Sequence, residues 1–261
     1  MRLSEVLNAL HGESGSVQVR VPEDWLQGRS VFGGLQAAIA VRAMRSLIGT
    51  DAPLRTLQGT FIGPVDADVS AQAQILRRGR NTLHVEARIV ASGEVLAVFI
   101  GIFGSLRESV VEQIAMLSTV VEHTEQTFPF IAGVTPNFIQ HFDAILTVGA
   151  LPFAGIPHAH ARYRLSLKDE DAAMSESHLL AFADFAPPLA MSALRRPAPG
   201  SSLTWQVDLL VDDLTPYALA GWCVDIELLA AGGGYGSQST AIVAPDGTTV
   251  ALGRQCMAVF G

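Results

Sequence analysis

The sequence predicts an α+β fold made of two tandem copies of one unit, in each of which an antiparallel sheet wraps around a central helix. Three observations lead to this prediction. An Ala-rich apolar helix is expected over residues 33–48. Strand-like segments follow it in a run, whereas a parallel sheet would alternate strands with helices. The same order of segments then recurs at an offset of about 150 residues, which indicates a duplicated domain.

The composition limits the class of protein. The chain has 261 residues, of which 49% are apolar and 16% charged, so it can bury a large core. Its net charge of −8 argues against a nucleic-acid partner, which would need a basic surface. Cys223 and Cys256 lie in apolar, strand-like runs and form no Cys-x-x-Cys pair, so we expect reduced core thiols.

No segment of the sequence looks like a targeting or membrane-spanning element. The longest apolar run, "VLAVFIGIFG", has about half of the ~20 residues that a membrane helix needs. The first residues, "MRLSEVLNAL", lack the pattern of a signal peptide. We therefore expect a cytoplasmic protein with no membrane partner.

The first unit is predicted over residues 1–107. Within its helix, Leu35, Ile39 and Ala43 fall on one apolar stripe that would face the sheet. Strand-like segments follow over residues 55–65, 68–80, 81–91 and 94–104. The "ASGE" turn between the last two segments predicts a hairpin. Residues 108–136 are expected to form a connector that includes part of a short helix, and residues 137–261 the second unit.

Three stretches of the second half resemble stretches of the first. "LLAFADFAPPLAMSAL" aligns with "GRSVFGGLQAAIAVRAM", "LTWQVDLLV" with "RTLQGTFIG", and "STAIVAPDGTTVALGRQCMAVFG" with "VEARIVASGEVLAVFIGIFG". In this alignment Asp184 stands at the place of Gly34, and Gln255 stands at the place of Gly101. Thr204 stands over Thr56, so both copies keep a hydroxyl there. The second copy alone therefore carries a carboxylate, a hydroxyl and an amide at these positions.

Four stretches together resemble the double hot-dog acyl-CoA thioesterases of the thioesterase II type, over nearly the whole chain. They are the "W…GRSVFGGLQAAIA" run, the "TFIGP" strand, the "LRRGRNTLHVEARIV" strand pair and the closing "VALGRQCMAVFG". The resemblance implies two tandem hot-dog domains and a hydrolase of lipid and fatty-acid metabolism. Its substrate would be an acyl-CoA, with coenzyme A entering only as part of that substrate and no metal or further cofactor. Because hot-dog proteins often pair through their sheets, a homodimer is also expected.

Thioesterases of this family use an Asp, a Thr or Ser, and a Gln to hold and activate a water molecule. The resemblance therefore implies that Asp184, Thr204 and Gln255 are the catalytic residues. A carboxylate can accept the proton of the attacking water as general base. A hydroxyl and an amide can fix that water in an orientation for attack. The alternative for Asp184 is a helix N-cap, with Pro187 in the first turn of the following helix.

Two further groups of residues are candidates for binding the substrate. Gly33 and Gly34 begin the first helix, where missing side chains allow close approach and backbone amides can face a developing oxyanion. The alternative is that they only permit tight packing of the helix. Arg77, Arg78 and Arg80, with His84 beside them, form a basic cluster that suits the phosphates of coenzyme A. The alternative for the arginines is a solvated strand end.

Other functions remain to be weighed against hydrolysis. A hot-dog hydratase or dehydratase would pair a His with an acidic residue near the central helix, and His178 is separated from Asp184 by a segment read as a strand. A non-catalytic protein that binds acyl-CoA is the second alternative. A serine hydrolase is set aside because no Gly-x-Ser-x-Gly elbow is present. His158 and His160 share a loop but predict no metal site.

Overall fold

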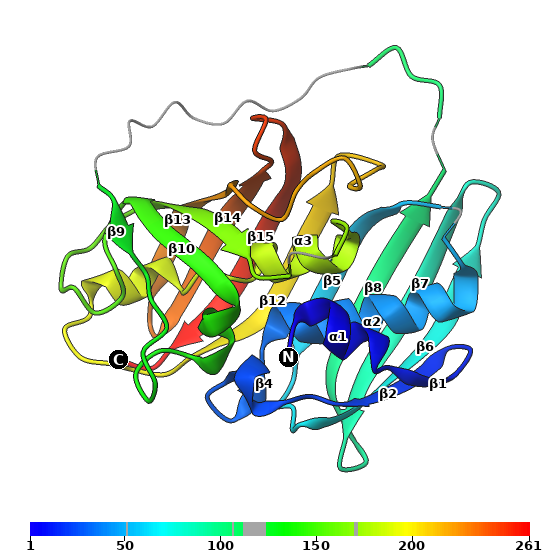
Figure 1. Ribbon diagram of the computed structural model, residues 1–261, viewed down its shortest axis with the longest axis horizontal. Helices are drawn as coiled ribbons and strands as arrows, with labels where there is room; N and C mark the ends of the chain where they lie inside the picture. Colours follow the sequence, from blue (N-terminus) through cyan, green and yellow to red (C-terminus); the bar gives the residue numbers. More distant parts are fainter. Residues whose placement is uncertain (51, 106, 112–123, 170–171) are drawn as a thin grey trace.

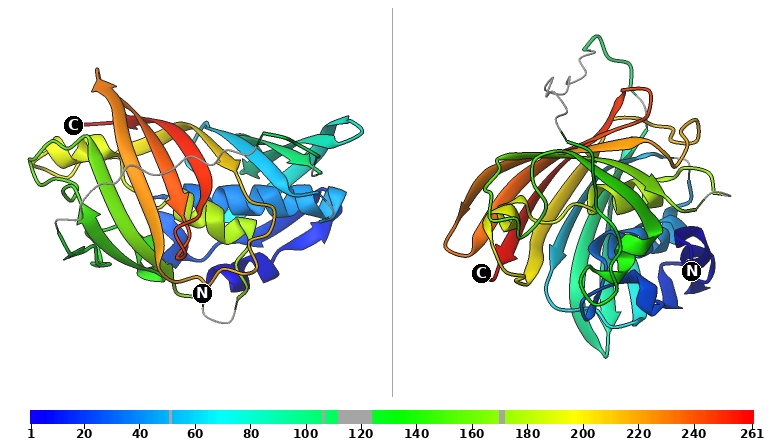
Figure 2. Two further views of the ribbon diagram at one scale, coloured as in Figure 1. Left: turned by 90° about the horizontal axis from the view of Figure 1, so that it is seen from above. Right: turned by 60° about the vertical axis from the view of Figure 1, so that its left-hand side comes forward.

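One curved antiparallel sheet carries the fold, and two helices, α2 and α3, lie side by side on its concave face (Figures 1 and 2). We describe it in a computed structural model that defines every residue except 51, 106, 112–123 and 170–171. In this part of the chain the sheet has 13 strands, in the order β1-β2-β6-β7-β8-β5-β12-β15-β14-β13-β11-β10-β9. The predicted α+β class, with antiparallel strands wrapped around helices, is confirmed.

The first half of the chain follows its sequence pattern closely. Its elements are α1 (Leu3–Asn8), β1 (His11–Glu13), β2 (Ser16–Arg20), the short 3-10 helix η1 (Glu23–Trp25), β3 (Leu26–Gln27), β4 (Ser30–Val31), α2 (Gly33–Ile48), β5 (Leu54–Phe61), β6 (Asp68–Arg78), β7 (Thr82–Ala91) and β8 (Glu94–Gly104). The predicted helix and its four following strands are all present. The β7–β8 turn has positive φ at Ser92 and Gly93, as a two-residue hairpin turn requires.

The second half repeats the sheet but not the position of the helix. Its elements are β9 (Gln126–Thr127), the 3-10 helix η2 (Asn137–His141), β10 (Phe142–Val148), β11 (His160–Leu167), α3 (Glu176–Ala183), the 3-10 helix η3 (Leu189–Ala193), β12 (Gly200–Leu209), β13 (Trp222–Gly232), β14 (Tyr235–Val243) and β15 (Thr249–Val259). Strand β9 pairs with β10, so the described end of the predicted connector adds an edge strand to the second half. Most of the short helix expected between residues 106 and 126 lies outside the described residues.

Helix α3 ends before Asp184, whereas the sequence alignment placed a helix after it. The Asp184 residue is the C-cap of α3, so the alternative reading of Asp184 as an N-cap is wrong. His178 likewise lies on this helix and not on a strand. Pro188 explains the difference, because it cannot donate the first backbone hydrogen bond that an α-helix capped at Asp184 would need, and a proline also disfavours the helical conformation of the residue before it. Only the short η3 forms after Pro188.

The two halves join edge to edge through β5 and β12. These strands pair antiparallel with Gln58 opposite Gln206, and the pairing runs symmetrically outward to Thr56 opposite Asp208 and Thr60 opposite Thr204. Such pairing is what a duplicated unit gives when its copies meet about a local two-fold axis. No helix within the described residues is both long and apolar enough to cross a membrane.

Candidate active site

A carboxylate, an amide and a hydroxyl meet on the concave face of the sheet beside the start of α2. The Asp184 side chain lies at the end of α3, and Gln255 lies on β15; their residues are 9% and 5% exposed. The Gln255 Nε2 donates to Asp184 Oδ1 at 2.9 Å and to Ser202 Oγ at 2.7 Å. Because an ionised carboxylate only accepts hydrogen bonds, the nitrogen of the amide must face it. One amide group thus holds both the carboxylate and the hydroxyl.

The glycine pair at the start of α2 leaves room for the Asp184 carboxylate and for α3, while its part in binding substrate stays a prediction. The Gly34 amide donates a hydrogen bond to the Asp184 carboxylate. A Cβ added to Gly33 would lie 2.6 Å from Asp184 Oδ2, so this glycine leaves space for the carboxylate. A Cβ on Gly34 would lie 2.7 Å from the Phe32 ring and 3.0 Å from the Leu180 carbonyl of α3. Gly33 therefore leaves space for the Asp184 carboxylate, and Gly34 permits close packing of α2 on α3.

The protonation of Asp184 is tuned by opposing effects. Burial raises the pKa of Asp184 to about 7, while the hydrogen bonds from Gln255 and Gly34 lower that pKa by stabilising the charged form. The positive end of the α2 dipole also favours an anion at this place. Near neutral pH the carboxylate therefore populates both its protonated and its ionised form, which suits a group that must take up and release a proton.

The prediction that Thr204 joins this group is wrong, and Ser202 takes its place. Thr204 is exposed and lies opposite Cys256, whereas the neighbouring Trp205 is buried and lies opposite Gln255. Adjacent residues of a strand face opposite sides of the sheet, so Thr204 faces away from the concave side. The β12–β15 register shifts between Ser202 and Thr204. This bulge adds one residue and returns the Ser202 side chain to the side of Gln255.

Aromatic rings hold the two helices that meet at the site. The Phe32 ring, just before Gly33, stacks on Phe138 with centroids 3.9 Å apart. The Phe185 ring, just after Asp184, also packs on Phe138. The centroids of these two rings are 6.3 Å apart, and the rings are nearly perpendicular. Edge-to-face and offset contacts of this kind add to the gain from burial alone. The ring of Phe138 therefore links the start of α2 to the end of α3 and fixes the carboxylate beside the glycines.

The three arginines of the predicted phosphate site lie apart from this group. Arg77, Arg78 and Arg80 are exposed at the end of the β6–β7 hairpin. The strand pairing places Arg78 of β6 and Phe103 of β8 in the same row across the sheet. The Arg45 guanidinium lies 4.5 Å from the centroid of the Phe103 ring. Arg45 belongs to the last turn of α2, roughly 18 Å along the helix axis from its first residue. The structure does not bring the arginines to Asp184, and their role stays a prediction.

A buried polar cluster that the sequence did not reveal ties α1 to α3. The His178 Nε2 lies 3.3 Å from Asp169 Oδ2, and its Nδ1 lies 2.7 Å from Ser175 Oγ. Ser4 of α1 donates to Asp169 from both its amide and its hydroxyl. The recorded hydrogen bonds of His178 thus go to these groups and not to Asp184. Among the described residues no group of three His, Cys, Asp or Glu side chains is placed to hold a metal ion.

The fold and the site define a double hot-dog protein with a buried, amide-bound carboxylate between its two halves. The sequence profile of the acyl-CoA thioesterase N-terminal domain matches residues 21–104, and that of the acyl-CoA thioesterase C-terminal domain matches residues 119–259. The chain belongs to this acyl-CoA thioesterase family. A comparison with curated proteins finds no match.

Solved structures share the fold along the whole chain. A conserved protein of unknown function with a hot dog fold from Alicyclobacillus acidocaldarius is 20% identical, with a TM-score of 0.87 over 100% of this chain and 99% of its own. The acyl-CoA thioesterase II from Mycobacterium marinum is 16% identical, with a TM-score of 0.73 over 99% and 98%. The tesB protein of Mycobacterium avium subspecies paratuberculosis is 13% identical, with a TM-score of 0.74 over 100% of both chains. At these identities the likeness concerns the fold.

Proposed function

We propose that the protein hydrolyses an acyl-CoA thioester to a free acid and coenzyme A, with Asp184 as general base. The observation that carries this proposal is the Gln255 amide, which donates to both the buried Asp184 carboxylate and the Ser202 hydroxyl beside the first turn of α2. The carboxylate can accept a proton, and the amide and hydroxyl can hold the water that gives it up. Membership of the acyl-CoA thioesterase family supports the substrate class.

The reaction needs no group beyond these side chains and the backbone of α2. Water attacks the thioester carbonyl carbon while Asp184 removes one of its protons, and a tetrahedral oxyanion forms. The Gly34 amide already binds the carboxylate, so the Gly33 amide of the same helix turn is the candidate donor to that oxyanion. The oxyanion then collapses, the carbon–sulfur bond breaks, and the thiolate of coenzyme A leaves and takes the proton that Asp184 holds.

A thiol-release assay over a panel of acyl-CoAs tests the proposal. We expect the purified chain to release thiol and Asp184→Asn to lower kcat about 100-fold or more, the range typical of a general base. Binding of a non-hydrolysable acyl-CoA thioether should change little in this variant. Asp213→Asn is the matched control, because Asp213 is an exposed carboxylate whose recorded hydrogen bonds go only to Thr215.

Two results would point to the other functions. If the protein binds the thioether tightly but releases thiol from no member of the panel, it is a non-catalytic acyl-CoA-binding protein. If it hydrates an enoyl-CoA and releases no thiol, the hydratase reading replaces ours. The buried pair of His178 and Asp169 would then be the first place to look for the acid and base.

A further inference from the structure

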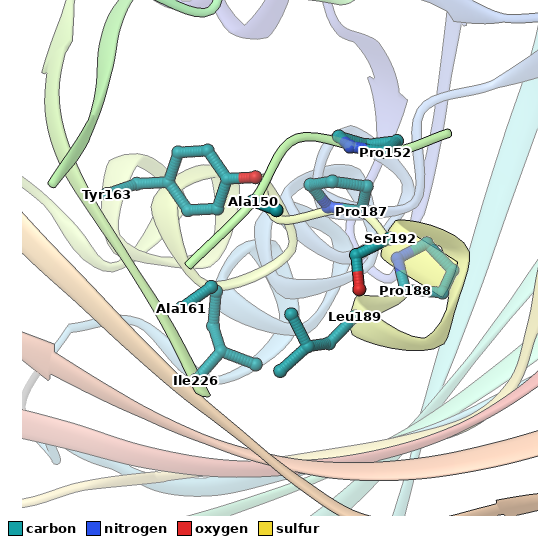
Figure 3. A pocket seen from close by; sticks show the side chains of 9 residues that line it. All are labelled: Ala150, Pro152, Ala161, Tyr163, Pro187, Pro188, Leu189, Ser192 and Ile226. Atoms are coloured by element: carbon teal, nitrogen blue, oxygen red, sulfur yellow. The ribbon is translucent and has the colours of Figure 1, made fainter. Parts of the chain in front are cut away.

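A small pocket lies on the concave face beside the loop that follows Asp184 (Figure 3). The pocket is lined by Ala150, Pro152, Ala161, Tyr163, Pro187, Pro188, Leu189, Ser192 and Ile226. Nearly all of these side chains are apolar, and they come from β11, β13, η3, the β10–β11 loop and the α3–η3 loop. Its accessible space is about 10 Å³, which is room for a single water-sized group.

The Tyr163 hydroxyl is a polar group in the wall of this pocket. Tyr163 is 2% exposed, its ring packs on Phe185 at 5.7 Å, and its oxygen points across the pocket towards Ala150 and Pro187 (Figure 3). Among the described residues the structure records no hydrogen bond to this hydroxyl. Burial raises the pKa of Tyr163 above its usual value, so the group stays a neutral donor. The Tyr163 oxygen is not among the fully buried polar atoms that lack a partner, so it meets the open space of the pocket, and a group bound there would become its partner.

The loop that follows Asp184 forms one wall of the pocket. Pro187 is three residues beyond Asp184, and the Leu189 amide donates to Gln238 Oε1 at 3.0 Å. Gln238 lies directly opposite Gln255 in the β14–β15 pair. Ile226 of the pocket is on β13, two strands from the β15 strand that carries Gln255. At a spacing of about 4.8 Å per strand, the nearest wall of the pocket, at Ile226, lies roughly 10 Å from the β15 strand that carries Gln255.

We propose, on the basis of the function proposed above, that this pocket receives the far end of the acyl group and that Tyr163 selects acyl chains bearing a hydroxyl or carbonyl oxygen there. An alkyl end would displace water from the pocket and leave the phenol without a partner, which is costly for a buried polar group. An oxygen at that end would replace the water and keep the hydrogen bond. Sites built in this way discriminate strongly against an analogue that lacks the polar group.

Matched pairs of substrates test the assignment. Hexanoyl-CoA and octanoyl-CoA are each compared with their terminal-hydroxy forms, in the wild type and in Tyr163→Phe. We expect the wild type to prefer one hydroxylated member by about tenfold or more in kcat/KM, and Tyr163→Phe to abolish that preference. The activity of Tyr163→Phe on the alkyl form should hold or rise. An equal loss on both members of each pair would show a merely structural role and overturn the proposal.

Two controls separate the phenol from folding and from pocket size. Tyr235→Phe removes an exposed phenol at the β13–β14 turn and should leave the preference unchanged. Ala161→Val narrows the pocket without touching the phenol, and it should lower kcat/KM for octanoyl-CoA more than for hexanoyl-CoA. An Ala161→Val variant that treats both chain lengths alike would also count against the assignment.

A binding experiment distinguishes failure of this inference from failure of the proposed hydrolysis. Thioether analogues of the same acyl-CoA pairs are titrated into Asp184→Asn and into the double variant with Tyr163→Phe. If the hydroxylated analogue binds about tenfold more tightly only where Tyr163 is present, the pocket assignment stands even when no thiol is released. If thiol is released but neither turnover nor binding depends on Tyr163, the hydrolysis stands and the assignment fails.

Discussion

Replacing Asp184 by Asn should make the stability of the protein less dependent on pH. In the folded protein burial holds the pKa of Asp184 at about 7, against an ordinary value of 3.8 in the unfolded chain. Between these two values the folded state keeps a proton that the unfolded state has lost. The free energy of unfolding therefore falls as pH rises through this window, and the loss is complete above the folded pKa. Asn cannot titrate, so the variant escapes the loss.

The size of the effect follows from the pKa shift. One pKa unit corresponds to about 1.4 kcal/mol, so a shift of about three units destabilises the wild type by ~4 kcal/mol at high pH. About 3 kcal/mol of this change falls between roughly pH 5 and pH 8. Asn is also expected to lose one of the hydrogen bonds from Gln255 and Gly34, at a cost of about 1 kcal/mol. That cost does not change with pH. The test therefore compares how steeply the free energy of unfolding changes with pH in the wild type and in the variant.

Urea unfolding at about pH 5 and pH 8, at one ionic strength, measures the difference. The wild type should lose about 3 kcal/mol relative to Asp184→Asn across this interval. His141 and His178, whose pKa values are lowered by burial, titrate in both proteins and cancel. Asp213→Asn is the control, since hydrogen bonds from Thr215 lower the pKa of Asp213 to below the window. A difference that is the same at both pH values would refute the reasoning.

Four further predictions concern turnover. Thiol release should rise with pH through about 7, and Gln255→Met, which removes a hydrogen bond that lowers the pKa of Asp184, should move the midpoint upward; a fixed midpoint contradicts this. Ser202→Ala should lower kcat about tenfold and Thr204→Val less than about twofold, whereas the reverse order would restore Thr204 to the site. Gly33→Ala places a methyl 2.6 Å from Asp184 Oδ2 and should lower kcat, while Gly232→Ala, with open space around it, should not. Replacing Arg77, Arg78 and Arg80 together by Glu should raise KM and leave kcat unchanged if they bind the phosphates, and an unchanged KM would end that assignment.

The features that the sequence predicted best are those set by local pattern. The apolar stripe of Leu35, Ile39 and Ala43 is fully buried on α2, and the β7–β8 hairpin turns where its Ser-Gly pair stands. The alignment of the two halves also found Asp184 and Gln255, because each polar residue replaces a glycine of the first copy. Periodicity and turn residues act over a few positions, so a single sequence is enough to reveal them.

The features that the sequence did not predict depend on strand register and on contacts between distant parts of the chain. A bulge between Ser202 and Thr204 decides which hydroxyl faces Gln255, and a bulge leaves little trace in the order of residues. The same alignment placed Asp184 over Gly34 as equivalents, yet in three dimensions the Gly34 amide binds the Asp184 carboxylate. Residues that occupy matching places in two copies are brought face to face only by the way the copies pack.

The first copy shows why the chain has one such constellation among its described residues. About the local two-fold axis at Gln58 and Gln206, Leu54 takes the place of Ser202, and Gly101 that of Gln255. Leu54 is buried and apolar, and a Cβ on Gly101 would lie 2.7 Å from the Met44 sulfur, so α2 fills the space that an amide side chain would need.

The copies have therefore become complementary. The first supplies the start of α2 with its two glycines, and the second supplies the carboxylate, the amide and the hydroxyl. Neither half holds all of these groups, so separated halves should lack activity even if each folds, and mixing them should restore it only where the β5–β12 pairing re-forms.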